Sequence, residues 1–190
     1  MKKILIHTCC APCVAYVYEL LSAEYDVTLY YYNPNIAPHD EYIKRYNELM
    51  GFCKKNNIPL IEGAWDNDQW TDAVQPFAHL GERSQRCWLC YEYRLEELFR
   101  TAKERGFDIV ASALSISPHK DTAKINDIGT GFSEKYSIPF YEADFKKRDG
   151  FKRSLELSKL NDFYRQDYCG CVFSKKESIE RKKKRSKEMV

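Results

Sequence analysis

Seven of the eight cysteines in this 190-residue sequence fall into three short groups, which are Cys9-Cys10-Ala11-Pro12-Cys13, Cys87-Trp88-Leu89-Cys90 and Cys169-Gly170-Cys171. Thiolates bind metal well when one short segment orders two of them, because the second ligand then costs little further entropy. The first two groups together supply enough thiolates for a zinc ion or an iron–sulfur cluster. The spacing therefore predicts a metal centre with sulfur ligands.

The third group differs from the first two because a single glycine separates its cysteines. A disulfide between Cys169 and Cys171 would close a very small ring, and strained disulfides tend to be labile and redox-active. The alternative is that one of the two supplies a further metal ligand. A dithiol beside a metal site indicates reductive chemistry. The eighth cysteine, Cys53, lies on the apolar side of an expected helix, where a free cysteine packs as a small hydrophobe.

The elements that must position these groups alternate along the chain. Short apolar or aromatic segments closed by Gly, Pro, Asn or small polar residues are expected as buried strands. They cover residues 3–7, 27–33, 59–63, 108–113 and 139–143, and helical patterns cover 12–23, 41–55, 90–105, 123–136 and 150–164. The alternation predicts a three-layer, Rossmann-like α/β fold with a mainly parallel five-stranded sheet and helices on both faces.

The predicted topology also gives a place for the chemistry. Ligands of open parallel sheets bind beyond the carboxyl ends of the strands, so the segments after the first, second, fourth and fifth strands should share one edge. The first cysteine group directly follows the first strand and opens the first helix, and a helix amino end favours thiolate over thiol. Because structural zinc usually draws its ligands from loops or knuckles, this position favours an iron–sulfur cluster.

Other polar side chains are expected at the same edge. His119 and Lys120 follow the fourth strand, and a histidine that titrates near neutrality suits protonation of a leaving oxygen. Asn33, Asn35 and His39 follow the second strand and can hold a ribose or a base edge. The alternative is that the Asn-Pro and Ser-Pro dipeptides mark turns and have no role in the chemistry.

Length and composition bound the remaining possibilities. The length suits one domain, expected over residues 1–174, followed by a basic tail over 175–190. Hydrophobic residues make up 44% and charged residues 31%, as in globular proteins. No apolar run approaches the ~18 residues of a membrane span, and the start has no secretory core, so a cytoplasmic protein with no membrane partner is expected.

The net charge of +2 hides an uneven distribution. Residues 175–188 contain eight basic and three acidic side chains, which leaves a charge of −3 on the remainder. Such a segment suits an arm that binds RNA, and a solvated helix end is the equal alternative.

The order of these motifs resembles that of the cobalamin-independent epoxyqueuosine reductases (QueH). The resemblance runs from the start of the chain to about Ser174. It rests on His7-Thr8-Cys9-Cys10-Ala11-Pro12-Cys13, Tyr32-Asn33-Pro34-Asn35-Ile36, Arg86-Cys87-Trp88-Leu89-Cys90-Tyr91 with Arg94-Leu95, Ser117-Pro118-His119-Lys120, and Tyr164-Arg165-Gln166-Asp167-Tyr168-Cys169-Gly170-Cys171.

The resemblance implies reduction of epoxyqueuosine to queuosine at the wobble position of tRNA. This is a two-electron, two-proton step with loss of water, and it implies a [4Fe-4S] cluster, an external low-potential electron donor and no cobalamin. The implied fold is similar to the nucleotide α-hydrolase (PP-loop-like) group, whose ATP-using members cradle phosphate in a glycine-rich loop. Residues 9–13 contain no glycine, so ATP is not expected.

Carried over residue by residue, the resemblance assigns two sets of cysteines. The implied cluster ligands are Cys9, Cys10, Cys87 and Cys90, and the implied catalytic redox pair is Cys169 and Cys171. Cys13 is then left with three interpretations. It tunes the cluster from the first helical turn, it replaces Cys9 or Cys10 as a ligand, or it holds an additional iron or other metal ion with Asp144 or Asp149.

Three other functions compete with the reductase. A zinc-stabilised RNA-binding module would use the cysteines only for folding. A tRNA sulfur-transferase of the PP-loop type would carry a persulfide on Cys169 or Cys171 and would need ATP. A thiol–disulfide oxidoreductase would leave five of the grouped cysteines without a role.

Overall fold

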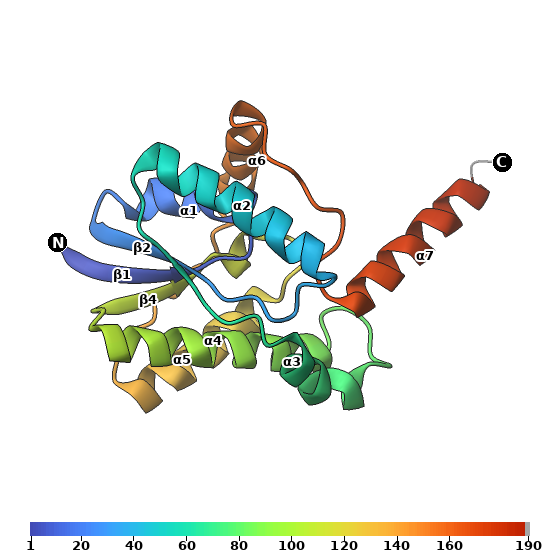
Figure 1. Ribbon diagram of the computed structural model, residues 1–190, viewed down its shortest axis with the longest axis horizontal. Helices are drawn as coiled ribbons and strands as arrows, with labels where there is room; N and C mark the ends of the chain where they lie inside the picture. The colour runs from blue at the N-terminus through green and yellow to red at the C-terminus, as the bar shows by residue number, and fades with distance from the viewer. Residues whose placement is uncertain (189–190) are drawn as a thin grey trace.

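A parallel sheet with helices on both faces forms the body of the protein (Figure 1). The computed structural model describes residues 1–188. The strands are β1 (Lys2–His7), β2 (Tyr25–Tyr31), β3 (Leu60–Glu62) and β4 (Ile109–Ser112). Their order is β3-β2-β1-β4, and every neighbouring pair is parallel. The chain therefore reverses its direction of winding between β1 and β4, which is where ligands bind in such sheets.

Helices cover both faces of this sheet. They are α1 (Ala11–Leu21), α2 (His39–Asn56), α3 (Asn67–Val74), α4 (Gln85–Arg105), α5 (Thr122–Tyr136), α6 (Gly150–Leu160) and α7 (Val172–Glu188), with short 3₁₀ turns at Gln75–Phe77 and Ala113–Ile116. Helices α1, α2 and α6 pack on one face, and α4 and α5 on the other. Helix α7 projects away from the body (Figure 1).

Side-chain alternation along β1 explains the two cores. Ile4 and Ile6 pack with α1 and α2, whereas Leu5 packs with α4 on the opposite face. Successive side chains of a strand point to opposite faces, so a run of buried residues indicates a strand covered on both sides. His7 ends the strand on the same face as Leu5 and brings a polar group to the carboxyl edge.

The prediction of five strands was wrong by one. Residues 139–143 make a single isolated bridge, Val110 to Phe140, beside β4. The N–H of Tyr141 donates to the Val110 carbonyl at 2.8 Å, but Pro139 has no N–H with which to extend the ladder. The mixed α/β architecture is confirmed, and the relation to the PP-loop-like group stays a prediction.

Two helices differ from their predicted bounds in ways that bear on the site. Helix α4 begins at Gln85, five residues before its expected start, so Cys87 lies in its first turn and Cys90 one turn later. Helix α6 ends at Leu160 and leaves residues 161–171 as an irregular segment that returns to the carboxyl edge. Helix α3 was not predicted, because only Trp70 and Val74 are buried on it and two residues give no apolar stripe.

The expected boundary between domain and tail falls near the start of α7. Met189 and Val190, the end of the predicted tail, lie outside the described residues. Among residues 1–188, no helix has both the length and the apolar character that crossing a bilayer requires.

Candidate redox and metal site

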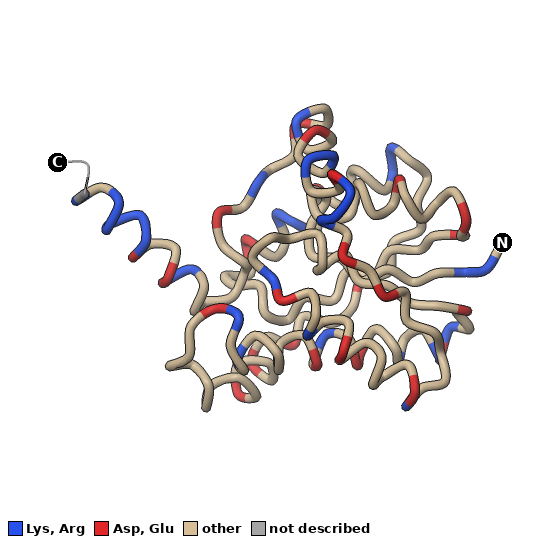
Figure 2. The backbone as a smooth tube through the Cα atoms, turned by 180° about the vertical axis from the view of Figure 1, so that it is seen from behind, with Lys and Arg blue, Asp and Glu red and all other residues tan. Residues whose placement is uncertain are grey.

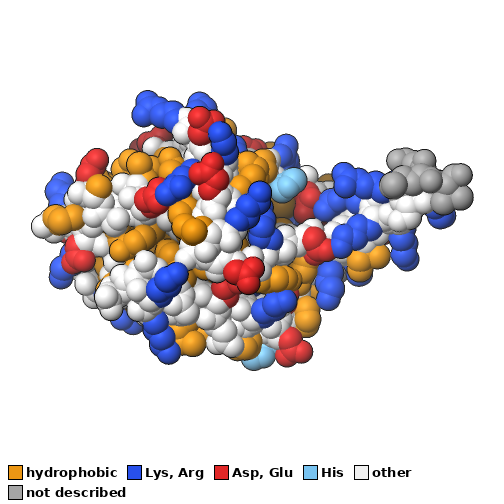
Figure 3. Space-filling model, turned by 90° about the horizontal axis from the view of Figure 1, so that it is seen from above, with side chains coloured by type: hydrophobic (Ala, Val, Ile, Leu, Met, Phe, Trp, Pro, Cys, Tyr) orange, Lys and Arg blue, Asp and Glu red, His pale blue; other side chains and the backbone are white. Residues whose placement is uncertain are grey.

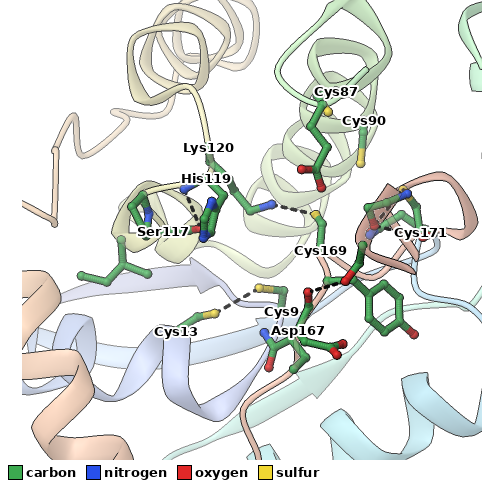
Figure 4. Close-up of a pocket in the computed structure, with 18 of the residues that line it drawn as sticks. Cys9, Cys13, Cys87, Cys90, Ser117, His119, Lys120, Asp167, Cys169 and Cys171 are labelled. Atoms are coloured by element: carbon green, nitrogen blue, oxygen red, sulfur yellow. Dashed lines mark hydrogen bonds between the residues drawn. The ribbon is translucent and has the colours of Figure 1, made fainter. Parts of the chain in front are cut away.

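A cavity of about 560 Å³ lies beyond the carboxyl ends of β1 and β4 (Figure 4). Segments that are far apart in the sequence supply its walls, including the starts of α1 and α4, residues 116–120 and residues 165–171. Six cysteines line it, namely Cys9, Cys13, Cys87, Cys90, Cys169 and Cys171. The structure thus brings all three cysteine groups to one cavity.

The three sulfurs at the start of α1 lie close together. The Cys9 Sγ is 3.5 Å from the Cys13 Sγ and 3.8 Å from the Cys10 Sγ, and all three lie within 4.8 Å of one another. Cys10 and Cys13 are joined by a disulfide, so all three can ligate a metal only once that bond is reduced. Cys10 is fully buried, receives a hydrogen bond from the Gln166 amide at 3.2 Å, and is absent from the cavity lining.

Cys87 and Cys90 are free thiols at the start of α4. Burial raises the pKa of both thiols, and the neighbouring cysteines add to the shift at Cys87. The Arg94 guanidinium lies 3.9 Å from the Cys90 Sγ and only partly offsets the burial. These groups are therefore thiols without a metal, and metal binding would release their protons.

Cys169 and Cys171 have opposite environments. Burial works against the thiolate of Cys169, but the Lys120 Nζ donates to its Sγ at 2.9 Å and holds its pKa below the usual value, with help from Arg94 and Arg45. Burial raises the pKa of Cys171 to about 12, and the negative charge of Cys169 adds to this shift. The two thiols therefore differ strongly in how readily they ionise.

The backbone of this pair is held from α2. Arg45 is fully buried and donates from Nη1 to the Cys169 carbonyl at 2.9 Å, while its Nε donates to Glu41 at 2.7 Å. Gly170 has φ +138°, and a Cβ there would lie 2.9 Å from Ile36. The loop therefore requires glycine for both its conformation and its close packing.

Of the two predicted proton donors, Lys120 is the one that donates a hydrogen bond to a cysteine sulfur. Its own burial disfavours the charged form, yet Cys169, Tyr91 and Cys9 raise its pKa, so the ammonium is retained. His119 lines the same cavity from an exposed position. Both predicted residues are thus at the cavity, with Lys120 at the sulfur and His119 on the solvent side.

The asparagines after β2 play different parts. Asn35 is 1% exposed, lines the cavity and has a side-chain oxygen with no hydrogen-bond partner among the described residues. Asn33 is buried, and its side-chain oxygen accepts from Arg94 at 2.6 Å. His39 packs against Trp65 at a tilt, with ring centroids 4.5 Å apart, and does not line the cavity.

The acidic residues considered as partners for Cys13 lie elsewhere. Asp144 pairs with Lys146 at 2.8 Å, and neither Asp144 nor Asp149 lines the cavity. The structure therefore does not bring either carboxylate together with Cys13.

Two buried arginines, Arg94 and Arg45, contact the cysteine groups and were not among the predicted site residues. Arg94 also donates from Nε to the ring of His7 at 3.3 Å, and burial, then Arg94, lowers the pKa of that histidine. Arg94 follows Cys90 by four residues, and this spacing could have placed the two on one helix face. No comparable signal exists for Arg45, because the carbonyls it binds are more than 120 residues away.

The donor set fits the cluster that the motifs imply. Iron–sulfur clusters are held by cysteine thiolates, and the cavity offers free or reducible sulfurs from two helix starts. Sulfur ligands also suit zinc, so the donor set alone indicates a thiolate-bound metal centre without fixing its type.

Known proteins are similar to this chain over nearly its whole length. The family model described as "Epoxyqueuosine reductase QueH" matches residues 4–177. The epoxyqueuosine reductase QueH of Streptococcus pyogenes is 39% identical over 92% of this chain and 71% of its own length. The proteins of that name from Haemophilus influenzae and Thermotoga maritima are 39% and 35% identical, over 93% and 95% of this chain and 73% and 94% of their own lengths. The chain therefore belongs to the QueH family of epoxyqueuosine reductases, which are oxidoreductases.

Proposed function

We propose that this protein reduces epoxyqueuosine to queuosine in tRNA. One observation carries the proposal: Cys169, with Lys120 at 2.9 Å, shares a cavity with sulfurs suited to a metal centre. The names of the relatives supply the reaction, and the cavity supplies groups that can perform it.

A [4Fe-4S] cluster is proposed at the two helix starts. Cys9, Cys87 and Cys90 are three of its ligands, and Cys13 replaces the Cys10 implied by resemblance, because Cys13 lines the cavity and Cys10 does not. When bound, the cluster supplies one-electron transfer to the neighbouring sulfurs. This assignment predicts that Cys13→Ser loses iron under anaerobic conditions and that Cys10→Ser retains it.

The redox pair balances the reaction. In the net conversion, the epoxide C–O bonds break, the carbons form an alkene, and the oxygen leaves as water with two protons. The two electrons come from the thiols of Cys169 and Cys171, which become a disulfide. An external low-potential donor then returns two electrons and two protons to this disulfide.

We assign proton transfer to Lys120 and His119. The Lys120 ammonium holds a proton at Cys169 and can pass it to the departing oxygen, which needs an acid within hydrogen-bond reach. His119 stands on the solvent side of the cavity, where it can return protons from water. Asn35, with its unpaired oxygen at the cavity wall, is suited to accept a hydrogen bond from the nucleoside.

The test is an anaerobic assay on the full chain. The purified protein is analysed for iron and sulfide, then incubated with tRNA containing epoxyqueuosine and a low-potential reductant, and the nucleosides are measured by mass. We expect four irons and four sulfides per cluster-loaded chain, as [4Fe-4S] requires, and loss of one oxygen from the nucleoside. Unchanged epoxide with a loaded cluster would overturn the proposal.

The competing functions give different results in the same samples. ATP turnover stimulated by tRNA would indicate a sulfur-transferase. One zinc and no sulfide after anaerobic purification would indicate the zinc-stabilised RNA-binding module and would remove the cluster assignment.

A further inference from the structure

Basic side chains surround α7, and those on one side of the helix line the cavity. Ser174, Ser178, Arg181, Lys182 and Arg185 all line the cavity. Their spacing of three, four and seven residues places them on one side of the helix. We call Arg181, Lys182 and Arg185 the cavity edge of α7.

The start of α7 is fixed to the body, which sets the direction of this edge. Ser174 and Ser178 are buried, and the Ser178 hydroxyl donates to the Asp167 carbonyl at 3.1 Å. Arg86 pairs with Glu177 at 2.7 Å. From Ile179 to Lys187 every side chain is exposed, and this part of the helix stands out from the body (Figure 3).

The basic side chains of this projecting part of α7 repel one another. Six of the seven residues 181–187 are Lys or Arg, seen as a blue series along α7 in Figure 2. Arg181 and Arg185 lie four residues apart, as do Lys183 and Lys187, and like charges at this spacing destabilise a helix. Arg181 pairs with Glu82 at 3.1 Å and Lys182 pairs with Asp167, but exposed pairs contribute little, so an external anion can replace them. A polyanion at the cavity would relieve this repulsion.

We infer that the cavity edge of α7 binds the RNA phosphates next to the nucleotide that enters the cavity. The inference rests on the proposed function and adds the surface that holds its substrate. A base that enters a pocket leaves its neighbouring phosphates at the rim, and arginine binds phosphate in a two-pronged geometry. Arg181 and Arg185 are about 6 Å apart along the helix axis, a reach that suits neighbouring phosphates.

RNA fits this edge better than a membrane does. A helix that lies on a lipid surface needs an apolar face opposite its charges. Ile179 is the single exposed large apolar side chain of α7 beyond its first turn, among the residues that the structure describes.

The test compares two variants of the full, cluster-loaded chain with equal loss of charge. The first is Arg181→Gln with Lys182→Gln and Arg185→Gln. The second is Lys176→Gln with Lys183→Gln and Lys187→Gln, on the opposite face of α7. Glutamine keeps helix propensity close to that of lysine and arginine, and circular dichroism checks that α7 persists.

Binding of an anticodon stem–loop, with and without epoxyqueuosine, is measured over a salt series. Loss of three contacts to unpaired RNA should make the slope of log affinity against log salt shallower by about 2. Between 0.1 M and 1 M salt, the wild type should then lose about 100-fold more RNA affinity than the variant. We expect this change in the cavity-edge variant, together with a raised KM at unchanged kcat, and an unchanged slope in the opposite-face variant.

Each of the other outcomes either supports or overturns the inference that the cavity edge of α7 binds RNA. Equal changes in both variants, or none in either, would overturn the inference even if epoxide reduction is intact. Loss of binding to phosphatidylserine vesicles by the cavity-edge variant, with RNA affinity unchanged, would overturn it in favour of a membrane. A slope difference between the variants in a protein that never reduces the epoxide would support the RNA surface and remove the catalytic proposal instead.

Discussion

Two pairs of cysteines line the same cavity, but the residues around them shift the thiol pKa values of the two pairs differently. Cys87 and Cys90 start a helix, and burial raises the pKa of both thiols by more than the nearby charges of Lys120 and Arg94 lower it. Cys169 and Cys171 lie in an irregular loop, where Lys120 favours the thiolate of the first and burial favours the thiol of the second. One pair is symmetric and the other polarised.

This difference agrees with the proposed division of the cysteines into metal ligands and reactants. Metal ligands need no neighbouring cation, because the metal itself displaces the proton from a buried thiol. A pair that forms and breaks a disulfide works best when one sulfur ionises near ambient pH, since the thiolate is the attacking group. The helix start thus suits a static metal centre, and the loop suits electron-pair chemistry.

The largest effect is expected at the symmetric pair. Cys87→Ala should remove the cluster and all turnover and should lower the free energy of unfolding, because the binding energy of a structural metal is also folding energy. Iron and sulfide content after anaerobic purification measures the first effect, and denaturant unfolding the last. Cys53→Ala is the control, since Cys53 is buried outside the cavity. Normal iron content in Cys87→Ala would remove this cysteine from the ligand set.

The next largest effect is expected at the polarised pair. Cys171→Ser should keep its iron and lose turnover, because serine cannot form the disulfide that accounts for the two electrons. The readouts are metal analysis and nucleoside mass from one preparation. Full turnover would show that Cys171 is not a reactant, and loss of iron would show that it is a ligand.

A partial effect is expected from the lysine that polarises Cys169. Lys120→Met should lower turnover by about 10²-fold, the usual contribution of one general acid. The pH dependence of Cys169 alkylation should change as well. Wild-type Cys169 has a lowered pKa and reacts below the ordinary thiol range, and removal of the cation should move the midpoint to higher pH. Lys124→Met, a lysine paired with Asp127 on α5, should leave the midpoint unchanged.

The smallest effect concerns the backbone of the polarised pair. Gly170→Ala should lower the free energy of unfolding by about 3 kcal/mol, because it combines an unfavourable φ with a tight contact to Ile36. Gly106→Ala has the first cost without the second and should lose roughly 1–2 kcal/mol. Equal losses in denaturant unfolding would mean that the loop yields around the added methyl.

The sequence predicted the parts of the fold that depend on local pattern. The buried run of β1 and the turn that carries Cys9 into α1 lie where hydrophobic spacing and Pro12 indicated. Residues 139–143 have a similar apolar pattern, but their pairing depends on which backbone groups an edge strand can offer, and Pro139 limits it. The pairing of residues 139–143 is thus set by tertiary structure and not by local hydrophobic spacing.

The site, like the fold, combines features that the sequence predicted with features that only the structure shows. Strand order predicted the first cysteine group at the carboxyl edge, and cysteine spacing predicted that the first two groups act together, whereas the meeting of all three groups at one cavity is a finding of the structure. The contacts of Lys120 with Cys169 and of Arg45 with the Cys169 carbonyl join residues 49 and 124 positions apart. No periodicity carries information about such contacts, so the polarity of the pair and its support from α2 emerge only in three dimensions.

The most direct test of the redox role of Cys169 and Cys171 is a single turnover without an external donor. The protein, with its cluster oxidised and both loop thiols reduced, is mixed anaerobically with tRNA containing epoxyqueuosine, and nucleosides and peptides are then analysed by mass. We expect one queuosine for each Cys169–Cys171 disulfide formed. Queuosine in equal amount with both thiols still free would contradict the proposal that this pair supplies the electrons.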